Sequence, residues 1–453
     1  MTAPPATHPP PTGPHGTFGA RNIVRFVRGQ LPWLTGLAEQ HGDVVRLKML
    51  GKWWFLVSHP DDIERVLVKD ARIMRRDAGV EIVRRFLGQG LLTSEGDVWK
   101  RQRKLMSQAF TPKRIAEYAT AMVRVSDVVL RRWRDGATAN VHQEMSQLTM
   151  EVVADVLFGA SMSAADVDDV RGAMEIANEY LSGSPEAMLR FPRWVPTPRN
   201  VRTNGAVATL DRIVHGIIAR RRTGEARDDL LGTLLAARDD DGAGMSDGQL
   251  RDEVMTLFLA GHETTSLALA HALYLLSENP DIAERLHAEV SSVLGDRLPT
   301  AEDARALPLA DRVLKETMRL YPPAWATGRE TTEPYELRGH PVPVGAQLIC
   351  SQWVVHRDAR WYPDPLRFDP DRWSPERAKD LPRFAYFPFG GGPRVCIGNH
   401  FAMMEATLLL AMIVQRFRVE LLPGERLELA PAVTLRQKGD GLRVRTHARS
   451  AAH

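Results

Sequence analysis

The spacing of apolar residues is the feature that most constrains what this chain can fold into. Segments such as DDIERVLVKD, IAEYATAMVRVSDVVLRRWRD and MSQLTMEVVADVLFG carry apolar residues three and four positions apart, which is typical of amphipathic helices. We expect the longest apolar helix at about Ser246–Ser277. Hydrophobic residues make up 44% of the 453 residues, so the chain can bury a large core. The pattern predicts a mainly α protein.

Short β-rich segments predict a smaller second region. Val44–Leu50 and Lys52–Ser58 are separated by Gly51, which is the pattern of a hairpin. Strand-like, turn-rich segments follow at about Thr331–Val355 and Arg418–Thr446. The chain is therefore expected to combine a large helical part with a minor β-rich region.

The expected domain organisation is simple, because the sequence has no internal repeat and no clean linker. We expect residues 1–18, which are rich in proline, to be disordered or extended, and residues 19–453 to form a single domain. The prolines of segment 183–200 predict a loop or lid between helices.

Charge and cysteine content exclude several classes of protein. The 59 basic and 56 acidic residues give a net charge of +3, unlike the basic stripe of a nucleic-acid-binding protein. Two cysteines cannot form a disulfide framework or a four-thiolate zinc site. No signal peptide and no membrane-spanning apolar run is recognisable, so we expect a cytoplasmic protein without a membrane anchor.

One of the two cysteines lies in an unusual loop, FPFGGGPRVCIG, from Phe387 to Gly398. Cys396 lies just before an expected helix, whose free N–H groups and dipole stabilise an anion. The glycines leave room for those N–H groups, and Arg394 adds positive charge nearby. The loop therefore favours a thiolate at Cys396.

Three interpretations of Cys396 are open. Taken alone, it is best explained as an inert cysteine in a helix-capping loop. It could also be the nucleophile of a cysteine hydrolase, activated by His400 or His356. The third interpretation is a thiolate ligand of haem iron. Cys350, in the apolar run GAQLICSQWVV, is interpreted as a buried structural thiol.

The long helix contains a polar patch in the segment LFLAGHETTSLALAHAL. Ala260 and Thr264 share a face, and the Thr264 hydroxyl can bond the carbonyl of residue 260. The patch could be only a local kink. Together with Cys396, however, Glu263 and Thr264 suggest a proton relay beside small residues that leave room for a small ligand, whereas His262 is expected to be structural.

Two further patterns are weak on their own. Glu316 and Arg319 lie three apart on one helix and could form an ordinary surface ion pair, or a buried charge network with Arg372. Trp99 and Arg103 lie four apart and could clamp a carboxylate.

The same segment around Trp99 carries three more cations, Lys100, Arg101 and Lys104. They predict a basic patch suited to an acidic protein partner, although an exposed basic helix face is the simpler interpretation.

Together these segments resemble the cytochrome P450 family of haem-thiolate monooxygenases. The loop matches the family's haem-binding signature F-x-x-G-x-R-x-C-x-G at Phe389, Gly392, Arg394, Cys396 and Gly398. The segments WKRQR, AGHETT, ETMR and FDPDRW match further family motifs in the family's order, except that a tryptophan replaces the last phenylalanine of F-x-P-x-R-F.

The resemblance implies haem b as cofactor and assigns roles to individual residues. Cys396 would be the axial thiolate, and Glu263 and Thr264 would handle protons on the oxygen side. Haem contacts would come from Trp99, Arg103, Ala260, Arg329, Pro388, Phe389, Arg394 and Gly398. The structural charge network would be Glu316, Arg319 and Arg372, and the substrate pocket would include Phe86, Leu91, Leu92, Leu257, Ala260, Ala326 and Thr327.

The implied activity is insertion of one oxygen atom of O2 into an apolar substrate. A fatty acid or similar lipid is favoured, with a macrolide or terpenoid as alternative; a peroxide-driven peroxygenase and a non-catalytic haem sensor are the other possibilities. Electrons would come from a ferredoxin or flavodoxin with its reductase, and the protein would be a monomer that binds no nucleic acid.

Overall fold

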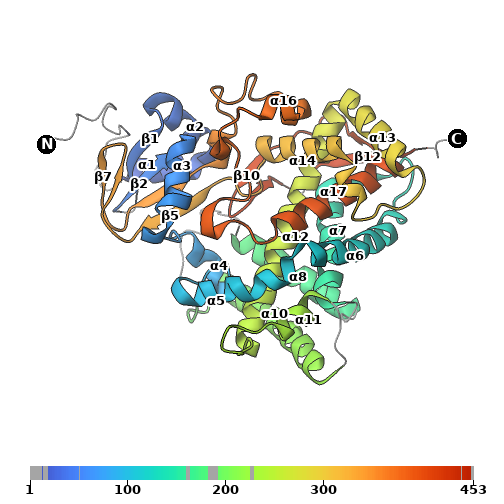
Figure 1. Ribbon diagram of the computed structural model, residues 1–453, viewed down its shortest axis with the longest axis horizontal. Helices are drawn as coiled ribbons and strands as arrows, with labels where there is room; N and C mark the ends of the chain where they lie inside the picture. The colour runs from blue at the N-terminus through green and yellow to red at the C-terminus, as the bar shows by residue number, and fades with distance from the viewer. Residues whose placement is uncertain are drawn as a thin grey trace. The chain divides into compact units, whose positions relative to one another are not determined.

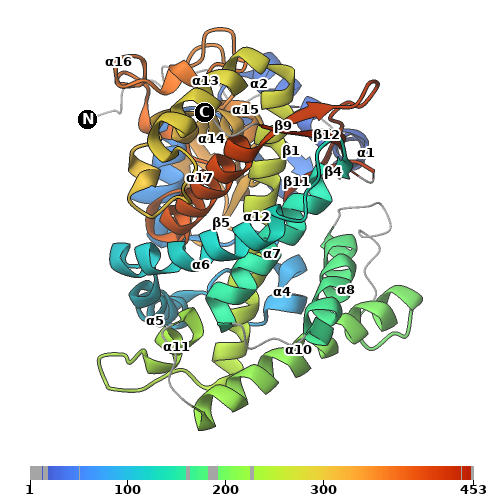
Figure 2. The ribbon, with the colours of Figure 1, turned by 90° about the vertical axis from the view of Figure 1, so that its right-hand side faces the viewer.

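The computed structural model describes residues 13, 19–49, 51–159, 164–181, 192–224, 229–439 and 441–449. The chain divides into two compact units, each built from several segments. Figures 1 and 2 show the helices and strands, coloured along the chain. Unit 1 comprises Met1–Ile82, Arg319–Arg367 and Pro375–Cys396, and unit 2 comprises Val83–Met318, Phe368–Ser374 and Ile397–His453. Helices α4 (Val80–Leu87) and α14 (Pro308–Leu320) each contribute residues to both units.

Unit 1 contains the predicted β-rich region. Its main sheet has the strand order β1-β2-β8-β5-β3, formed by β1 (Val44–Met49), β2 (Lys52–Val57), β8 (Gln347–Cys350), β5 (Thr327–Thr331) and β3 (Met74–Arg75). Strands β1 and β2 pair antiparallel around Gly51, whose φ of 77° suits glycine, so the predicted hairpin is confirmed.

The remaining elements of unit 1 are short. A hairpin is formed by β6 (Tyr335–Leu337) and β7 (His340–Val342). The helices are α1 (Ala20–Arg28), α2 (Gln30–His41), α3 (Pro60–Glu64), α15 (Gln352–Val355) and α16 (Pro375–Ala378). A π-helical turn, Arg65–Lys69, continues directly from α3.

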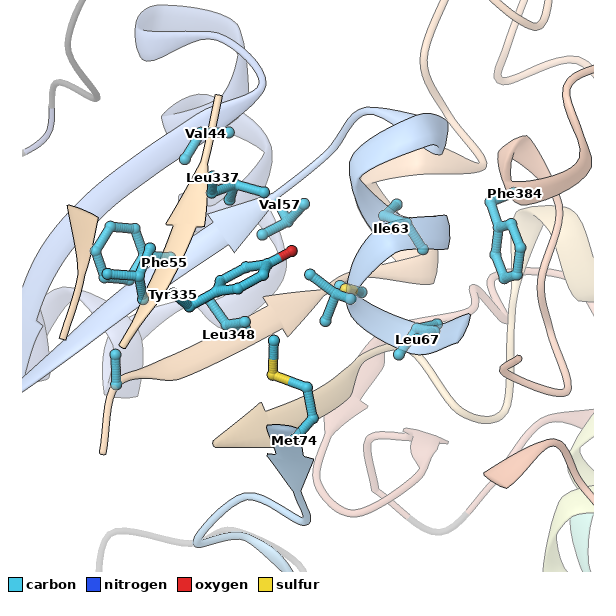
Figure 3. Close-up of a cluster of buried hydrophobic side chains, with 14 of the residues drawn as sticks. Val44, Phe55, Val57, Ile63, Leu67, Met74, Tyr335, Leu337, Leu348 and Phe384 are labelled. Atoms are coloured by element: carbon cyan, nitrogen blue, oxygen red, sulfur yellow. The ribbon is translucent and has the colours of Figure 1, made fainter. Parts of the chain in front are cut away.

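An apolar core joins the sheet of unit 1 to α3 and to the segment before the cysteine loop (Figure 3). Phe55 and Leu348 come from the sheet, Ile63 and Leu67 from α3 and the π-helical turn, and Phe384 from the chain leading to the loop. All five are buried, and each such side chain contributes roughly 1.5–3 kcal/mol when it leaves water. The cysteine loop is thus attached to a rigid support.

Unit 2 contains most of the long helices. They are α5 (Gly96–Ser107), α6 (Pro112–Leu130), α7 (Val141–Phe158), α8 (Ala164–Leu181), α10 (Pro198–Thr223), α11 (Leu230–Ala236), α12 (Asp247–Glu278), α13 (Pro280–Leu294) and α17 (Asn399–Arg416). Helix α12 contacts α7, α10, α11, α13 and α17 (Figure 2). The Ser246 hydroxyl caps α12 by accepting the Gln249 N–H (3.2 Å). The predicted long apolar helix is therefore confirmed almost to the residue.

Short strands complete unit 2. They are β4 (Thr138–Asn140), β12 (Arg443–Ala448) and β9 (Phe417–Leu421), which form one sheet, and β10 (Leu429–Pro431) and β11 (Leu435–Gln437), which form a hairpin. Strands β9 to β12 confirm the strand-like tail, and the mainly helical prediction is confirmed for the chain.

Two expectations fall partly on residues outside the described part of the chain. Of residues 1–18, only Gly13 is described, so the extended N-terminus stays a prediction. Residues 183–191 of the proposed loop are not among the described residues; residues 192–197 are non-helical, and α10 begins at Pro198, inside the predicted loop. Among the described helices, none has the length and hydropathy needed to cross a membrane.

Candidate active site

The cysteine loop of unit 1 exposes the thiol of Cys396. The loop passes through a 3-10 turn, Gly392–Arg394, and the Cys396 N–H donates to the carbonyl oxygen of Phe389 (3.0 Å). Cys396 is exposed, and helix α17 begins three residues later at Asn399, as the sequence predicted. The backbone of the loop is therefore bonded to itself, while the sulfur remains accessible.

Two glycines of the loop are required by close packing. A Cβ atom at Gly392, whose φ is 66°, would overlap the carbonyl oxygen of Leu67, and a Cβ at Gly391 would overlap the Phe384 ring. At Gly390, φ is 72° but nothing lies within 4 Å of the Cβ position. From the sequence, the glycines were expected to make room around the sulfur. The structure shows that two of them let the loop lie against the π-helical turn and Phe384.

His356 supports the loop, a role that the sequence did not reveal. The Phe387 N–H donates to Nε2 of this buried histidine (3.0 Å), while Gln352 donates to the carbonyl of Phe387 (3.4 Å) and to Thr327 Oγ1 (2.8 Å). Nε2 of His356 is therefore occupied as an acceptor for the Phe387 N–H. His400, the other candidate, is exposed at the start of α17.

Unit 1 also holds the two arginines predicted to bind propionates. Arg329 is buried on β5 and donates to the carbonyl of Gly328 (2.8 Å). Burial raises the pKa of Asp77, although Arg76 and Arg329 nearby counteract this. Arg394 is half-buried in the turn before Cys396. A buried or half-buried guanidinium suits a carboxylate, because charge-assisted hydrogen bonds offset the cost of burial.

In unit 2, one face of α12 differs from the rest of this buried helix. Ala260 is exposed, and Leu257, Gly261 and Thr264 are half-buried, whereas their neighbours on the helix are mostly buried. These residues lie three or four apart and so share one face. Thr264 Oγ1 donates to the carbonyl of Ala260 (2.7 Å), which confirms the predicted bond. This face of small residues can lie against a flat bound group.

The neighbouring Glu263 is buried and points to the β10–β11 hairpin. Its Oε1 accepts bonds from Thr434 Oγ1 (2.6 Å) and from Nε of Arg436 (2.5 Å), and Nη2 of Arg436 also contacts it. Thr434 and Arg436 were not predicted from the sequence, because nothing in a short β segment indicates a partner 171 residues away. His262 bonds Ser146 Oγ (2.9 Å), and burial lowers its pKa to about 4, in agreement with a structural role.

Helix α5 carries the other two predicted haem contacts and the basic patch. Trp99 and Arg103 are both half-buried, one turn apart. The three cations beside them are each paired with an aspartate of unit 2. The pairs are Lys100 with Asp97 (2.9 Å), Arg101 with Asp239 (2.7 Å) and Lys104 with Asp240 (2.5 Å). The expected free basic patch is therefore largely neutralised by its own neighbours.

The predicted charge network includes a member that the sequence did not reveal, Trp373. Glu316 is fully buried and accepts from Arg372 Nε (3.2 Å) and from the indole N–H of Trp373 (3.0 Å) in unit 2. Arg319, in unit 1, donates to backbone carbonyls. These carbonyls belong to His356 (2.8 Å), Pro365 (2.6 Å) and Arg367 (3.1 Å). The tryptophan that departs from the family pattern thus supplies an extra hydrogen bond.

Replacing Trp373 with phenylalanine, the residue of the family pattern, should destabilise this protein. The change removes an indole donor and leaves one oxygen of the buried Glu316 with one donor fewer, which costs about 1–2 kcal/mol. Urea unfolding measures the effect. Trp194→Phe is the control, because Trp194 is 83% exposed; equal stability of the two variants would contradict the assigned role.

Leu91, one of the predicted pocket residues of unit 2, contacts a buried carboxyl group. Phe86 is fully buried and packs edge-on against Tyr180, with ring centroids 5.7 Å apart. The Leu91 N–H donates to Oε2 of Glu253 (2.8 Å), and Leu92 is half-buried. Glu253 is fully buried on α12, and burial raises its pKa to about 8. At pH 7 Glu253 is therefore neutral, and its hydrogen bond with Leu91 joins α12 to the loop that precedes α5.

Because this carboxyl group is buried, we expect Glu253→Gln to stabilise the folded protein by an amount that depends on pH. Because the pKa of Glu253 is about 8 in the folded protein and near 4.5 in the unfolded chain, the contribution of this carboxyl group to stability is largest below pH 4.5 and is lost as pH rises toward 8. The glutamine cannot ionise. The substitution should therefore leave the free energy of unfolding nearly unchanged at pH 5 and raise it by about 1–2 kcal/mol at pH 8.5, relative to wild type. Melting temperatures of the wild type and the variant at both pH values measure this effect. An equal difference in melting temperature between the two proteins at pH 5 and pH 8.5 would contradict the prediction.

Each unit, described by itself, contains residues whose chemistry suits haem b. Unit 1 offers an accessible thiol at Cys396 with Arg394 and Arg329, and unit 2 offers the exposed Ala260 face with Trp99 and Arg103. A thiolate suits iron, the cations suit two propionates, and a face of small residues suits a macrocycle. Pro388, Phe389 and Gly398 are half-buried, and their contacts with haem stay predictions.

Comparison with known proteins agrees with this chemistry. The family model described as Cytochrome P450 matches residues 9–441. Cyclooctatin synthase of Streptomyces melanosporofaciens is 39% identical over 429 residues, which cover 93% of this chain and 92% of that protein. Pentalenene oxygenase of Streptomyces avermitilis is 34% identical over 402 residues, covering 88% and 89%.

Solved structures give the same result. The structure described as retinoic acid bound cyanobacterial CYP120A1 has a TM-score of 0.86 and 29% sequence identity, covering 97% of this chain and 99% of that one. The fold, the cysteine loop and the sequence relatives agree. This chain belongs to the cytochrome P450 family and is a monooxygenase whose cofactor is haem b.

Proposed function

We propose that this monooxygenase hydroxylates a cyclic terpenoid. The observation that carries the proposal is the set of relatives that match over most of the chain. They are cyclooctatin synthase, cyclooctat-9-en-7-ol 5-monooxygenase, which is 36% identical over 402 residues, and pentalenene oxygenase. The solved relative that binds retinoic acid, an isoprenoid, supports the same substrate class.

The predicted pocket residues are compatible with a hydrocarbon skeleton. None of the seven, from Phe86 to Thr327, carries a charge, and Ala260 and Ala326 are small. Apolar sites of this kind bind through buried area and shape, with few polar groups to fix orientation. A fatty acid is the less favoured substrate, because the three sequence relatives above are named for terpenoids.

The chain's own groups have distinct tasks in this proposal. Haem, when bound, supplies the activation of O2, and a thiolate ligand raises the electron density that favours O–O cleavage. We assign the thiolate to Cys396 and the propionate contacts to the four side chains Trp99, Arg103, Arg329 and Arg394. Thr264 and Glu263 hold and move the protons that the reaction consumes.

A ligand panel tests the substrate class. The purified haem protein is titrated with a cyclic terpene hydrocarbon such as pentalenene, a cyclic terpene alcohol, a saturated C16 fatty acid and a macrolide, while the haem absorption spectrum is recorded. We expect the terpenes to displace the water ligand, and turnover under 18O2 to label their hydroxylated products. Binding and labelling of the fatty acid or macrolide alone would overturn the proposal.

The electron donor is proposed to be a separate ferredoxin or flavodoxin with its reductase. Because Lys100 and Lys104 are paired with aspartates, a docking partner must compete with Asp97 and Asp240 for them. Neutralising the two lysines should slow reduction by the partner without changing haem content. Unchanged reduction rates with either donor would place docking elsewhere.

A further inference from the structure

The β10–β11 hairpin supplies both donors to the acidic residue of the oxygen-side motif. Oε1 of Glu263 accepts from Thr434 Oγ1 and from the guanidinium of Arg436. The ion pair is largely withdrawn from water, with side-chain exposures of 11% for Glu263 and 18% for Arg436. An ion pair that is buried to this extent and shares a further hydrogen bond has a fixed geometry, in contrast to a surface pair.

The two members of the acid–alcohol pair point in different directions. Successive residues of a helix are turned by about 100°. Thr264 lies on the face of Ala260 and donates to the carbonyl of that residue, so its oxygen remains an acceptor. Glu263 is turned toward the hairpin. A proton that reaches Thr264 through Glu263 must therefore arrive from the hairpin side of α12.

The charges around Glu263 show that Arg436 is its main counter-ion. His142, near the start of α7, and His262, on α12, also lie within electrostatic reach of Glu263 and Arg436. Burial lowers the pKa of both histidines, and Arg436 lowers each further, so both are neutral at pH 7. Without Arg436, the buried Glu263 would lose its paired cation, and removing one partner of a buried ion pair is strongly destabilising.

We propose that Arg436 and Thr434 are positioning residues for oxygen activation: they hold the Glu263 carboxyl group turned to the hairpin, where it can take up a proton. The inference rests on the proposed proton roles of Glu263 and Thr264. The overall reaction is RH + O2 + 2e− + 2H+ → ROH + H2O, with electrons from the redox partner. Glu263 binds a proton from solvent on the hairpin side, releases it toward Thr264 and returns to the carboxylate, so it is neither consumed nor oxidised.

Coupling of electron use to product tests the role of the hairpin. In Arg436→Gln we expect the fraction of electrons that appear in product to fall about tenfold, with the remainder in hydrogen peroxide, because a positioned acid–base group contributes at least this factor. Arg436→Lys should restore part of the coupling, and Thr434→Val, which keeps the shape of the side chain, should show a smaller loss.

A second readout does not depend on turnover. Melting temperatures of Glu263→Gln, Arg436→Gln and the double variant form a mutant cycle, and the two changes should be strongly non-additive. Arg443→Gln is the matched control, because Arg443 lies on β12, is exposed and bonds Glu425; it should leave coupling unchanged. Haem content and the spectrum with carbon monoxide should be normal in all variants.

The outcomes separate this inference from the proposed function. If Glu263→Gln couples as well as wild type, the proton role of Glu263 itself is wrong. If Glu263→Gln is uncoupled but Arg436→Gln is not, the hairpin has no positioning role. Additive melting temperatures, or failure of lysine to restore coupling at position 436, would equally overturn the inference.

Discussion

Cys396→Ser should abolish thiolate ligation while leaving the fold intact. A serine hydroxyl does not ionise near neutral pH and does not donate charge to iron as a thiolate does. We expect the variant to bind haem more weakly, to lose the red-shifted absorption band of the reduced, carbon-monoxide-bound protein, and to lose substrate oxidation by orders of magnitude. Absorption spectra of the purified protein and product analysis measure both effects.

The second cysteine is the control for this experiment. Cys350 is fully buried on β8, and burial raises its pKa to about 12, so it stays a neutral thiol. Cys350→Ala should lose some stability through a small cavity but keep the spectrum. A normal spectrum in Cys396→Ser, or its loss in Cys350→Ala, would contradict the assignment of the axial ligand.

Gly392→Ala should be strongly destabilising although it adds only one methyl group. A non-glycine residue at a φ of 66° costs about 1–2 kcal/mol, and overlap with the Leu67 carbonyl requires a backbone shift that costs about 1–3 kcal/mol more. The total is about 2–5 kcal/mol. Because the shift displaces the chain leading to Cys396, haem content should fall too. Urea unfolding and the haem-to-protein ratio measure the two effects.

Gly390→Ala separates backbone strain from overlap. Gly390 has a similar φ of 72°, yet its Cβ position has nothing within 4 Å. This variant should therefore lose only the first 1–2 kcal/mol and should retain haem. Equal losses at the two positions would show that the contact with Leu67 is unimportant.

The sequence was sufficient for features that depend on neighbours along the chain. The hairpin around Gly51, the helix capped by Ser246 and the bond from Thr264 to the Ala260 carbonyl all follow from local rules of periodicity, capping and turn geometry. The cysteine loop was recognisable for the same reason, since its residues form one continuous motif. The preference for a fatty acid had no comparable basis, and it is unconfirmed.

Contacts between distant segments were not predictable in this way. The role of His356 depends on folding it against Phe387, and that of Trp373 on bringing its indole to Glu316. Neither bond was predicted from the sequence, because a side chain's partner is set by packing and not by its neighbours in sequence.

By itself, the sequence determined the family, the helical character and the chemistry available at Cys396, because these are written in short motifs with fixed spacing. Only the tertiary structure decided what surrounds each reactive group. It gave Glu263 a counter-ion from the β10–β11 hairpin, paired the cations of α5 with aspartates, and made Gly392 essential by placing a carbonyl against it. The physical reason is that charge compensation and close packing act across space, between residues that are far apart in the chain.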